Sequence, residues 1–299
     1  MKGSRFMILP AKMHGAKLCL VLLLAAAGLG ACARKSEDTL ERVRREGAVR
    51  VGYANEAPYA YLEGGSQTLT GEAPEIARIV LRQMGVEEVE GVLTEFGSLV
   101  PGLRAGRFDL IAAGMYITPS RCEQIDFSEP SYCIGEAFIV KAGNPLDLHS
   151  YEDAAQHPTA RIGVVAGAVE LNYARSVGIP EDRVAIFPDA ASAVEGLQAG
   201  RIDAYAGTST TVENFLTVAG DGAGIERADP FTDPVIDGKR VRGCGAFGFR
   251  KEDLAFRDEF NRHLKAVVGS PEHLSLIKKF GFSESDLPTG MTTDLLCHP

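Results

Sequence analysis

The stretch Gly102-Leu-Arg-Ala-Gly-Arg-Phe-Asp-Leu-Ile-Ala112 decides the fold, because the chain contains it twice. The second copy, Gly196-Leu-Gln-Ala-Gly-Arg-Ile-Asp-Ala-Tyr-Ala206, is identical at seven of eleven positions. Each copy indicates the end of a helix, a glycine turn and the start of a strand. Arg50-Val51-Gly52 and Arg161-Ile162-Gly163 precede the two copies in a similar way. The sequence therefore predicts two lobes of the same topology, each a small sheet flanked by helices.

Short apolar segments alternate with helical stretches along the whole chain, which indicates an α/β fold with mainly parallel strands. A short charged helix is predicted over residues 39–46, ended by Gly47. The predicted strands cover residues 49–54, 90–94, 110–113, 137–141, 161–165, 183–187, 204–206 and 246–250.

Ligands of open α/β sheets bind beyond the carboxyl ends of the strands, where the connecting loops converge. Two lobes that face each other place a cleft between those loops. Binding residues are therefore expected in loops 55–61, 96–98 and 114–121 of the first lobe and in loops 166–170 and 207–211 of the second.

The N-terminus has the pattern of a secretory signal. Its first 31 residues hold four cations and no acid, with an apolar run from Leu18 to Leu29. That run is about a dozen residues, short of the roughly 20 that a membrane-spanning helix needs. The run ends in Leu29-Gly30-Ala31-Cys32, which resembles the lipobox of bacterial lipoproteins and predicts a lipid on Cys32. The alternative to lipidation is a soluble secreted protein in which Cys32 is incidental. A separate alternative concerns the start of the chain, since Met13 would begin a more compact signal.

Removal of residues 1–31 changes the formal net charge from −9 to −13, because four cations are lost. An acidic surface argues against nucleic acid and anionic lipid as partners, so membrane contact is expected through the N-terminal lipid only. Export permits disulfides, and the four cysteines that follow Cys32 allow three complete pairings. Their spacing matches no zinc pattern and the histidines are scattered, so neither a metal nor a cofactor is expected. The four cysteines are Cys122, Cys133, Cys244 and Cys297.

The run FGSLVPGLRAGRFDLIAAGMYITPSRCEQIDFSEPSY, residues 96–132, resembles the signature of family 3 extracellular solute-binding proteins. RVGYANEAPYAY at residues 50–61 and PFTDPVIDGKRVRGCGAFGFRKED at residues 230–253 are similar to the ectoine- and hydroxyectoine-binding members of that family. The resemblance implies the two-lobed type II periplasmic-binding fold and capture of a small zwitterionic solute for the permease subunits of an ABC importer. It also implies a monomer that is exported to the periplasm or to the outer face of the cell membrane.

The same resemblance sets the expected domain layout, in which the chain crosses between the lobes near residues 132–135 and returns near residues 242–245. The expected parts are a lipoprotein signal peptide (1–31), a linker with the short helix (32–46), lobe one (47–133 and 245–285), lobe two (136–241) and a C-terminal tail (286–299).

Arg121 matches the arginine that holds the substrate carboxylate in this family, and its planar fork suits two parallel hydrogen bonds to such a group. Thr118 precedes it in Thr118-Pro119-Ser120-Arg121, where Thr can cap a helix and Pro suits the first turn. By resemblance, Glu56 faces the N–H groups of the ligand's amidinium. Tyr59, Phe96 and Tyr116 correspond to aromatic walls, whose faces attract a delocalised cation.

The second lobe is expected to contribute the backbone amides of Gly167, Ala168 and Val169, which precede a helix. Amino acid binders of the wider family often carry an Asp near Thr208 for the α-ammonium group. The segment here is Ala206-Gly-Thr-Ser-Thr210, without an acid. This departure argues against a common α-amino acid ligand.

The sequence leaves three alternative functions open. A polar amino acid binder and a betaine binder belong to the same class of protein, although a betaine has no N–H donor for Glu56. Periplasmic dehydratases resemble the family too, and Glu56 is the obvious acid or base for such an enzyme. The sequence contains no nucleophile elbow, no paired catalytic carboxylates and no phosphate loop, so we expect a binding protein with no catalytic residue.

Overall fold

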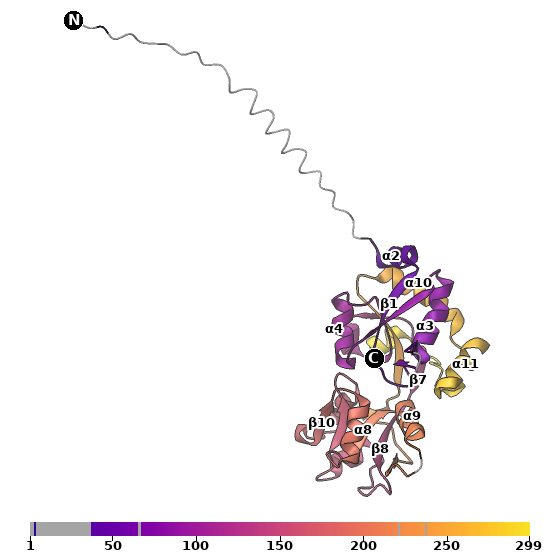
Figure 1. Cartoon of the computed structure of the whole chain (residues 1–299). Helices are drawn as coiled ribbons and strands as arrows, with labels where there is room; N and C mark the ends of the chain where they lie inside the picture. Colours follow the sequence, from indigo (N-terminus) through magenta and orange to yellow (C-terminus); the bar gives the residue numbers. More distant parts are fainter. Residues whose placement is uncertain (1–2, 4–36, 65–66, 221, 237) are drawn as a thin grey trace. The chain divides into compact units, whose positions relative to one another are not determined.

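The computed structural model describes residue 3 and residues 37–64, 67–220, 222–236 and 238–299. The predicted signal peptide over residues 1–31 and the lipidation site Cys32 lie outside the described residues. Residues 38–299 form two lobes, each built on its own sheet (Figure 1).

The sheet of lobe one has a parallel centre and antiparallel strands at one side. β4, β1 and β5 pair in parallel, whereas β15 runs antiparallel to β5 and pairs with β6 and β7. β15 begins at Gly243, earlier than the predicted strand 246–250. β5 extends to Tyr116, beyond the predicted strand 110–113. The strands are β1 (Ala48–Tyr53), β4 (Glu88–Leu93), β5 (Leu110–Tyr116), β6 (Asp126–Phe127), β7 (Tyr132–Ile134) and β15 (Gly243–Phe249).

Helices cover both faces of this sheet because side chains alternate along β5. Leu110 and Ala112 pack in one cluster with α3 and α10, whereas Ile111 and Ala113 pack in another with α4. The helical elements of lobe one are α2 (Thr39–Glu46), α3 (Glu72–Gln83), η1 (Phe96–Ser98), α4 (Leu99–Arg104), α5 (Pro119–Cys122), α10 (Leu254–Val267), α11 (Pro271–Ile277), η3 (Lys278–Phe280), η4 (Glu284–Asp286) and α12 (Thr293–Cys297). A hairpin of β2 (Tyr61–Leu62) and β3 (Leu69–Thr70) follows β1.

The sheet of lobe two repeats this plan in the order β10-β9-β11-β8-β12, with antiparallel pairing at β8 and β12. One face packs on α6 and α7, and the other packs on α8 and α9. The strands are β8 (Glu136–Lys141), β9 (Ile162–Val165), β10 (Val184–Phe187), β11 (Ala204–Thr208) and β12 (Ile225–Arg227), with a separate hairpin of β13 (Val235–Ile236) and β14 (Lys239–Arg240). The helical elements are α6 (Tyr151–Gln156), α7 (Glu170–Ser176), η2 (Glu181–Arg183), α8 (Ala190–Gln198) and α9 (Ser209–Ala219).

The repeated sequence corresponds to the same contact in both lobes. In lobe one, the Arg50 Nη2 and Nε atoms donate to Asp109 over 2.8 and 3.1 Å. In lobe two, the same atoms of Arg161 donate to Asp203 over 3.1 Å each. Each Asp also accepts the backbone N–H of its Arg, so the pair fastens the start of the first strand to the start of its neighbour.

The structure contains two disulfides, which correspond to one of the three pairings that the sequence left open. Cys133–Cys244 joins β7 to β15 at the point where these two strands connect the lobes, and the two residues are also register partners. Cys122–Cys297 joins α5 to α12, so the C-terminal residues predicted as a tail are fastened to lobe one. The first bond therefore lies at the connection between the lobes, and the second lies next to Arg121.

The repeated Arg–Asp pairs predict unequal losses of stability. The Asp109 side chain is 1% exposed and also lies 2.6 Å from Arg42, whereas the Asp203 side chain is 23% exposed. Breaking a buried charge network costs about 3 to 5 kcal/mol, and an exposed pair contributes at most about 1 kcal/mol. Asp109→Asn should therefore lower the free energy of unfolding by about 3 kcal/mol and Asp203→Asn by about 1 kcal/mol or less, measured by urea denaturation. Equal losses would contradict this account of the repeat.

Candidate ligand-binding cleft

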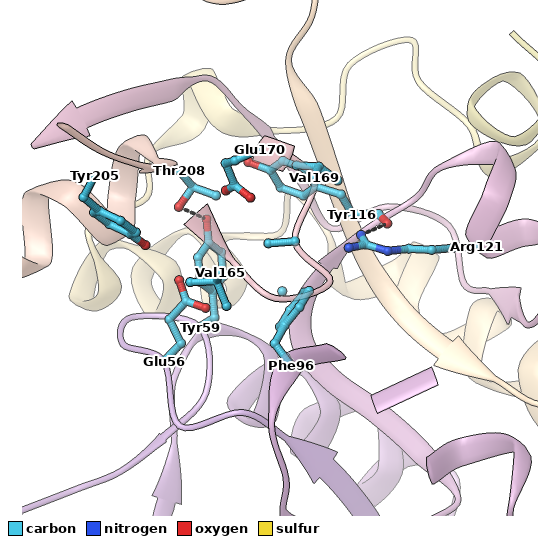
Figure 2. Close-up of a pocket in the computed structure, with 13 residues that line it drawn as sticks. Glu56, Tyr59, Phe96, Tyr116, Arg121, Val165, Val169, Glu170, Tyr205 and Thr208 are labelled. Atoms are coloured by element: carbon cyan, nitrogen blue, oxygen red, sulfur yellow. Dashed lines mark hydrogen bonds between the residues drawn. The ribbon is translucent and has the colours of Figure 1, made fainter. Parts of the chain in front are cut away.

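A small cavity, with about 30 Å³ open to the centres of water molecules, lies between the carboxyl ends of the strands of the two lobes (Figure 2). Its walls come from the loops after β1, β5, β9 and β11 and from η1, as the strand-end rule requires. The lining residues are Glu56, Tyr59, Phe96, Ala113, Gly114, Tyr116, Arg121, Val165, Ala168, Val169, Glu170, Tyr205 and Thr208.

Arg121 is the cation of this cavity, and it is 8% exposed. Its Nη1 donates to the Tyr116 carbonyl over 2.7 Å, and its Nη2 donates to the Gly167 carbonyl over 2.9 Å. The guanidinium also lies 5.5 Å from the centre of the Phe96 ring. Among the described residues, Arg121 forms no ion pair within 4.0 Å. Burial lowers the pKa of Arg121 and the charge of Glu170 opposes this, and a guanidinium stays charged at neutral pH.

The helix that carries Arg121 is a single turn and is held from two sides. Thr118 caps α5, because its Oγ1 accepts the backbone N–H of Arg121 over 3.3 Å, and Pro119 occupies the first turn. Cys122, the next residue after Arg121, forms the disulfide to α12. A one-turn helix has little stability of its own, so these two ties fix the direction of the guanidinium.

Glu56 supplies an acid in the loop after β1. Its backbone pairs with Ala60 in both directions, over 2.8 and 2.9 Å, which closes the loop into a tight turn. Its Oε1 accepts a 2.8 Å hydrogen bond from the Thr211 hydroxyl of lobe two. Burial raises the pKa of Glu56, and the bond from Thr211 opposes that rise because it favours the carboxylate.

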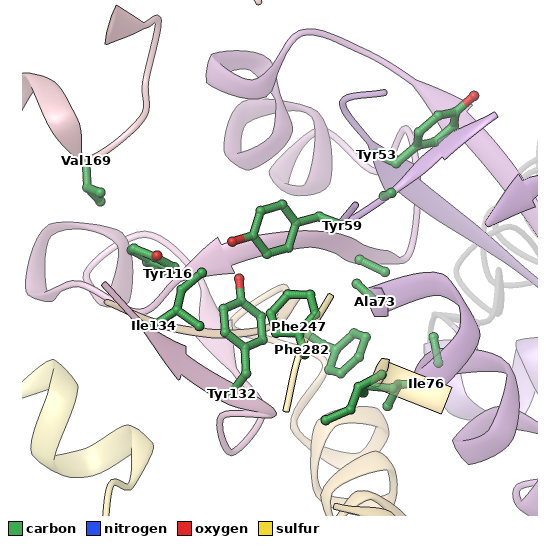
Figure 3. Packing of buried hydrophobic residues seen from close by; sticks show 14 of the residues in the cluster. Tyr53, Tyr59, Ala73, Ile76, Tyr116, Tyr132, Ile134, Val169, Phe247 and Phe282 are labelled. Carbon is green, nitrogen blue, oxygen red and sulfur yellow. The ribbon is translucent and has the colours of Figure 1, made fainter. Parts of the chain in front are cut away.

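Tyr59 joins the aromatic wall to lobe two. Its hydroxyl donates to Thr208 over 2.9 Å and accepts from Thr210 over 2.8 Å. The centre of its ring lies 5.6 Å from that of Tyr132 in the buried cluster that Figure 3 shows. Gly114 is required here, since its φ is +64° and an added Cβ would come within 2.2 Å of the Tyr59 ring.

The lobes are closed on one another. Hydrogen bonds cross from Tyr59 to Thr208, from Thr211 to Glu56 and from Arg121 to Gly167. The two backbones approach so closely that a Cβ on Gly167, at φ +77°, would meet the Cα of Gly97 at 2.6 Å. A ligand in this cleft is therefore enclosed by both lobes at once.

The structure brings together eight of the ten predicted ligand-binding residues on the cavity wall: Glu56, Tyr59, Phe96, Tyr116, Arg121, Ala168, Val169 and Thr208. The other two, Thr118 and Gly167, lie beside it, where Thr118 caps α5 and Gly167 offers its carbonyl to Arg121. Sequence reasoning missed Ala113, Gly114, Val165, Glu170 and Tyr205. Glu170 had a signal, because it ends the loop 166–170 in which binding residues were expected.

Glu170 is a second acid in the wall, 5% exposed, at the start of α7. Burial and, to a smaller extent, the charge of Glu56 raise its pKa to about 7, against the opposing effects of its own backbone N–H and of Arg121. Lobe two therefore has an acid at the cavity although the segment near Thr208 has none.

The described residues contain no group of three or more His, Cys, Asp or Glu side chains placed to hold a metal ion. None of the described helices is both long enough and apolar enough to cross a membrane.

A cleft closed between two similar α/β lobes, with one guanidinium, two acids and aromatic walls, defines a binding protein for a small charged solute. Residues 49–284 match the family model of bacterial extracellular solute-binding proteins, family 3, and the chain belongs to that family.

Similar proteins of known sequence or structure include three that bear on the ligand. A probable amino-acid ABC transporter periplasmic-binding protein from Sinorhizobium fredii is 39% identical over 87% of this chain and 86% of its own. The crystal structure of EhuB in complex with hydroxyectoine has a TM-score of 0.78 and 36% identity, and the match covers 87% of this chain and 97% of that one. An ancestral amino acid-binding protein, a precursor of cyclohexadienyl dehydratase, has a TM-score of 0.69 and 25% identity over 81% of this chain and 99% of its own.

Proposed function

We propose that this protein captures ectoine or hydroxyectoine in the cleft between its lobes and delivers it to the permease subunits of an ABC importer. The observation that carries the proposal is the buried Arg121 guanidinium, which has no acid within ion-pair distance among the described residues. A buried charge without a partner is costly, so the site is suited to receive a carboxylate. Two of the five N–H donors of Arg121 are used by backbone carbonyls, which leaves three for that carboxylate.

The opposite end of the ligand is a delocalised amidinium with N–H groups. Glu56 can accept from such a group, since its Oε2 makes no hydrogen bond with the described residues while Oε1 is held by Thr211. The rings of Tyr59, Phe96 and Tyr116 line the same cavity, and an aromatic face attracts a cation by about 0.5 to 2 kcal/mol. One end of the zwitterion thus meets a cation and the other meets an acid between flat walls.

The similarity to EhuB supports the ectoine-type ligand, and the similarity to the Sinorhizobium fredii protein supports the coarser class of amino-acid transport. The proposed activity is binding and release, with no chemical change of the solute. Incubation with ectoine followed by mass spectrometry should return ectoine alone.

We also propose that the chain is exported, loses residues 1–31 and is anchored by a lipid on Cys32, as the motif Leu29-Gly-Ala-Cys32 suggests. The protein would then act as a monomer at the periplasmic or outer face of the membrane, close to its permease.

Lipid attachment is tested by metabolic labelling with a radioactive fatty acid. The wild-type protein should carry the label, and Cys32→Ala should not, because the thiol is the acceptor. Label retained on Cys32→Ala would exclude lipidation at this residue.

Arg121 is tested by two substitutions. Removing one partner of a buried charge pair costs about 2 to 5 kcal/mol, so Arg121→Ala should weaken ectoine binding by about thirty- to several-thousand-fold. Arg121→Lys keeps the charge but loses the planar fork, so it should restore only part of the affinity. Isothermal calorimetry gives both dissociation constants, and an unchanged value for Arg121→Ala would remove this residue from the ligand contact.

Glu56 is tested by the ratio of ectoine affinity to betaine affinity. Glu56→Gln keeps the size of the side chain but exchanges an acceptor-only anion for a neutral amide, so ectoine binding should fall steeply. A fully methylated betaine has no N–H donor and is held mainly by the aromatic faces, so its binding should fall less. Calorimetry in one buffer measures the ratio in both proteins. A ratio that does not change would deprive the ectoine assignment of its main chemical support.

A further inference from the structure

The two disulfides differ in their access to solvent. Cys133 and Cys244 are 7% and 2% exposed and belong to paired strands of the lobe-one sheet. Cys122 and Cys297 are half-buried, and both line a groove in lobe one with about 410 Å³ open to the centres of water molecules. A thiolate that reduces a disulfide must reach one of its sulfur atoms. A reductant is therefore expected to open Cys122–Cys297 well before Cys133–Cys244.

The short helix α12 relies on the accessible bond for its place on lobe one. Its residues are exposed or half-buried. The Thr293 backbone N–H donates to Glu129 over 3.1 Å, and the Thr293 hydroxyl donates to the Ser128 carbonyl over 2.5 Å. Leu296 packs at the edge of an apolar cluster. A helix of five residues has little stability of its own, so opening the disulfide should let α12 separate from α5.

The other end of the accessible bond lies directly beside the ligand-facing guanidinium. Cys122 follows Arg121 in α5, a helix of four residues that Thr118 caps. The Arg121 side chain donates to the carbonyls of Tyr116 and Gly167, so a shift of α5 moves a group that contacts both lobes. A planar guanidinium makes two parallel hydrogen bonds to a carboxylate only in the right orientation. The tie at Cys122 therefore bears on the direction of that group.

We propose that Cys122 and Cys297 form a redox-sensitive pair that positions Arg121, and that reduction of their disulfide by a dithiol weakens ligand binding. The inference rests on the proposed function in one respect, since it takes Arg121 as the contact of the ligand carboxylate. One thiolate of the dithiol attacks a sulfur of the pair, breaks the S–S bond and forms a mixed disulfide. The second thiolate then displaces the remaining protein sulfur. Two electrons and two protons pass to Cys122 and Cys297, and the dithiol becomes a disulfide.

The first measurement tests which bond is opened, with dithiothreitol as the reductant. Brief treatment of the folded protein, followed by alkylation and mass spectrometry, should label Cys122 and Cys297. Cys133 and Cys244 should stay joined, because the sheet shields their sulfur atoms. Labelling of all four cysteines at the same rate would overturn the inference.

The second measurement is calorimetry of ectoine with the oxidised and the selectively reduced protein. Reduction should weaken binding at least about fivefold, because a small misplacement of a charged contact is costly. The double variant Cys122→Ala, Cys297→Ala should bind as weakly as the reduced wild type and should not respond to dithiothreitol. An unchanged dissociation constant on reduction, or a double variant that binds like the oxidised wild type, would refute the proposed role.

Arg121→Lys separates the positioning of Arg121 from a general loss of structure. A lysine ammonium is a point charge on a flexible stem and has no plane to orient. Reduced and oxidised Arg121→Lys should therefore bind ectoine within about twofold of each other, although both bind more weakly than wild type. A loss on reduction as large as that of the wild type would mean that the bond supports the whole lobe and does not position Arg121.

Hydrogen exchange of the free protein gives a result that does not depend on ectoine. The backbone N–H groups of Cys122 and Ile125 donate to the carbonyls of Thr118 and Arg121 over 2.9 and 3.0 Å. Reduction should speed their exchange at least about tenfold and leave the amides of β5 unchanged, because the opening is local. Unchanged exchange overturns the inference whether or not ectoine binds. If the oxidised protein binds no ectoine, the proposed function fails and the exchange rates decide the inference alone. Circular dichroism melting verifies that each variant folds.

Discussion

The arrangement of the cleft depends on one buried guanidinium that has contacts on both lobes. Arg121 belongs to lobe one, yet one of its two hydrogen bonds reaches the Gly167 carbonyl of lobe two. A charge in this position is tolerated only if hydrogen bonds and a counter-ion compensate its lost hydration. The backbone supplies the hydrogen bonds, and the described residues supply no close acid. If Arg121 holds the ligand carboxylate as proposed, ligand binding and lobe closure are linked through the same side chain.

The rest of the fold keeps the groups around Arg121 in place. The Arg50–Asp109 and Arg161–Asp203 pairs fasten adjacent parallel strands at their starts, so the opposite ends of those strands present their loops in a fixed register. Cys133–Cys244 joins the two strands that connect the lobes. A sheet in each lobe and a cross-linked connection between them are the features of proteins whose lobes close on a ligand about a hinge.

Much of this could be predicted from local sequence. The helix 39–46 and its end at Gly47 follow from local propensity, and the cap at Thr118 follows from local hydrogen bonding. The echo around Asp109 and Asp203 predicted two equal lobes, since the same contact recurs in both. The disulfide pairing could not be predicted, because sequence separations of 175 and 111 residues carry no information about which cysteines meet.

Glu170, the second acid of the cleft, shows the same limit of prediction from local sequence. The position near Thr208 lacks an acid, and from sequence this counted against amino acid ligands. Glu170 places a carboxyl in the lobe-two wall from a different loop, and its charge helps burial to raise the pKa of Glu136, which lies 34 residues earlier in the chain. Their proximity arises from the packing of α7 and β8 in one lobe, which no local pattern encodes. The absence of an acid near Thr208 therefore does not leave the lobe-two wall of the cavity without one.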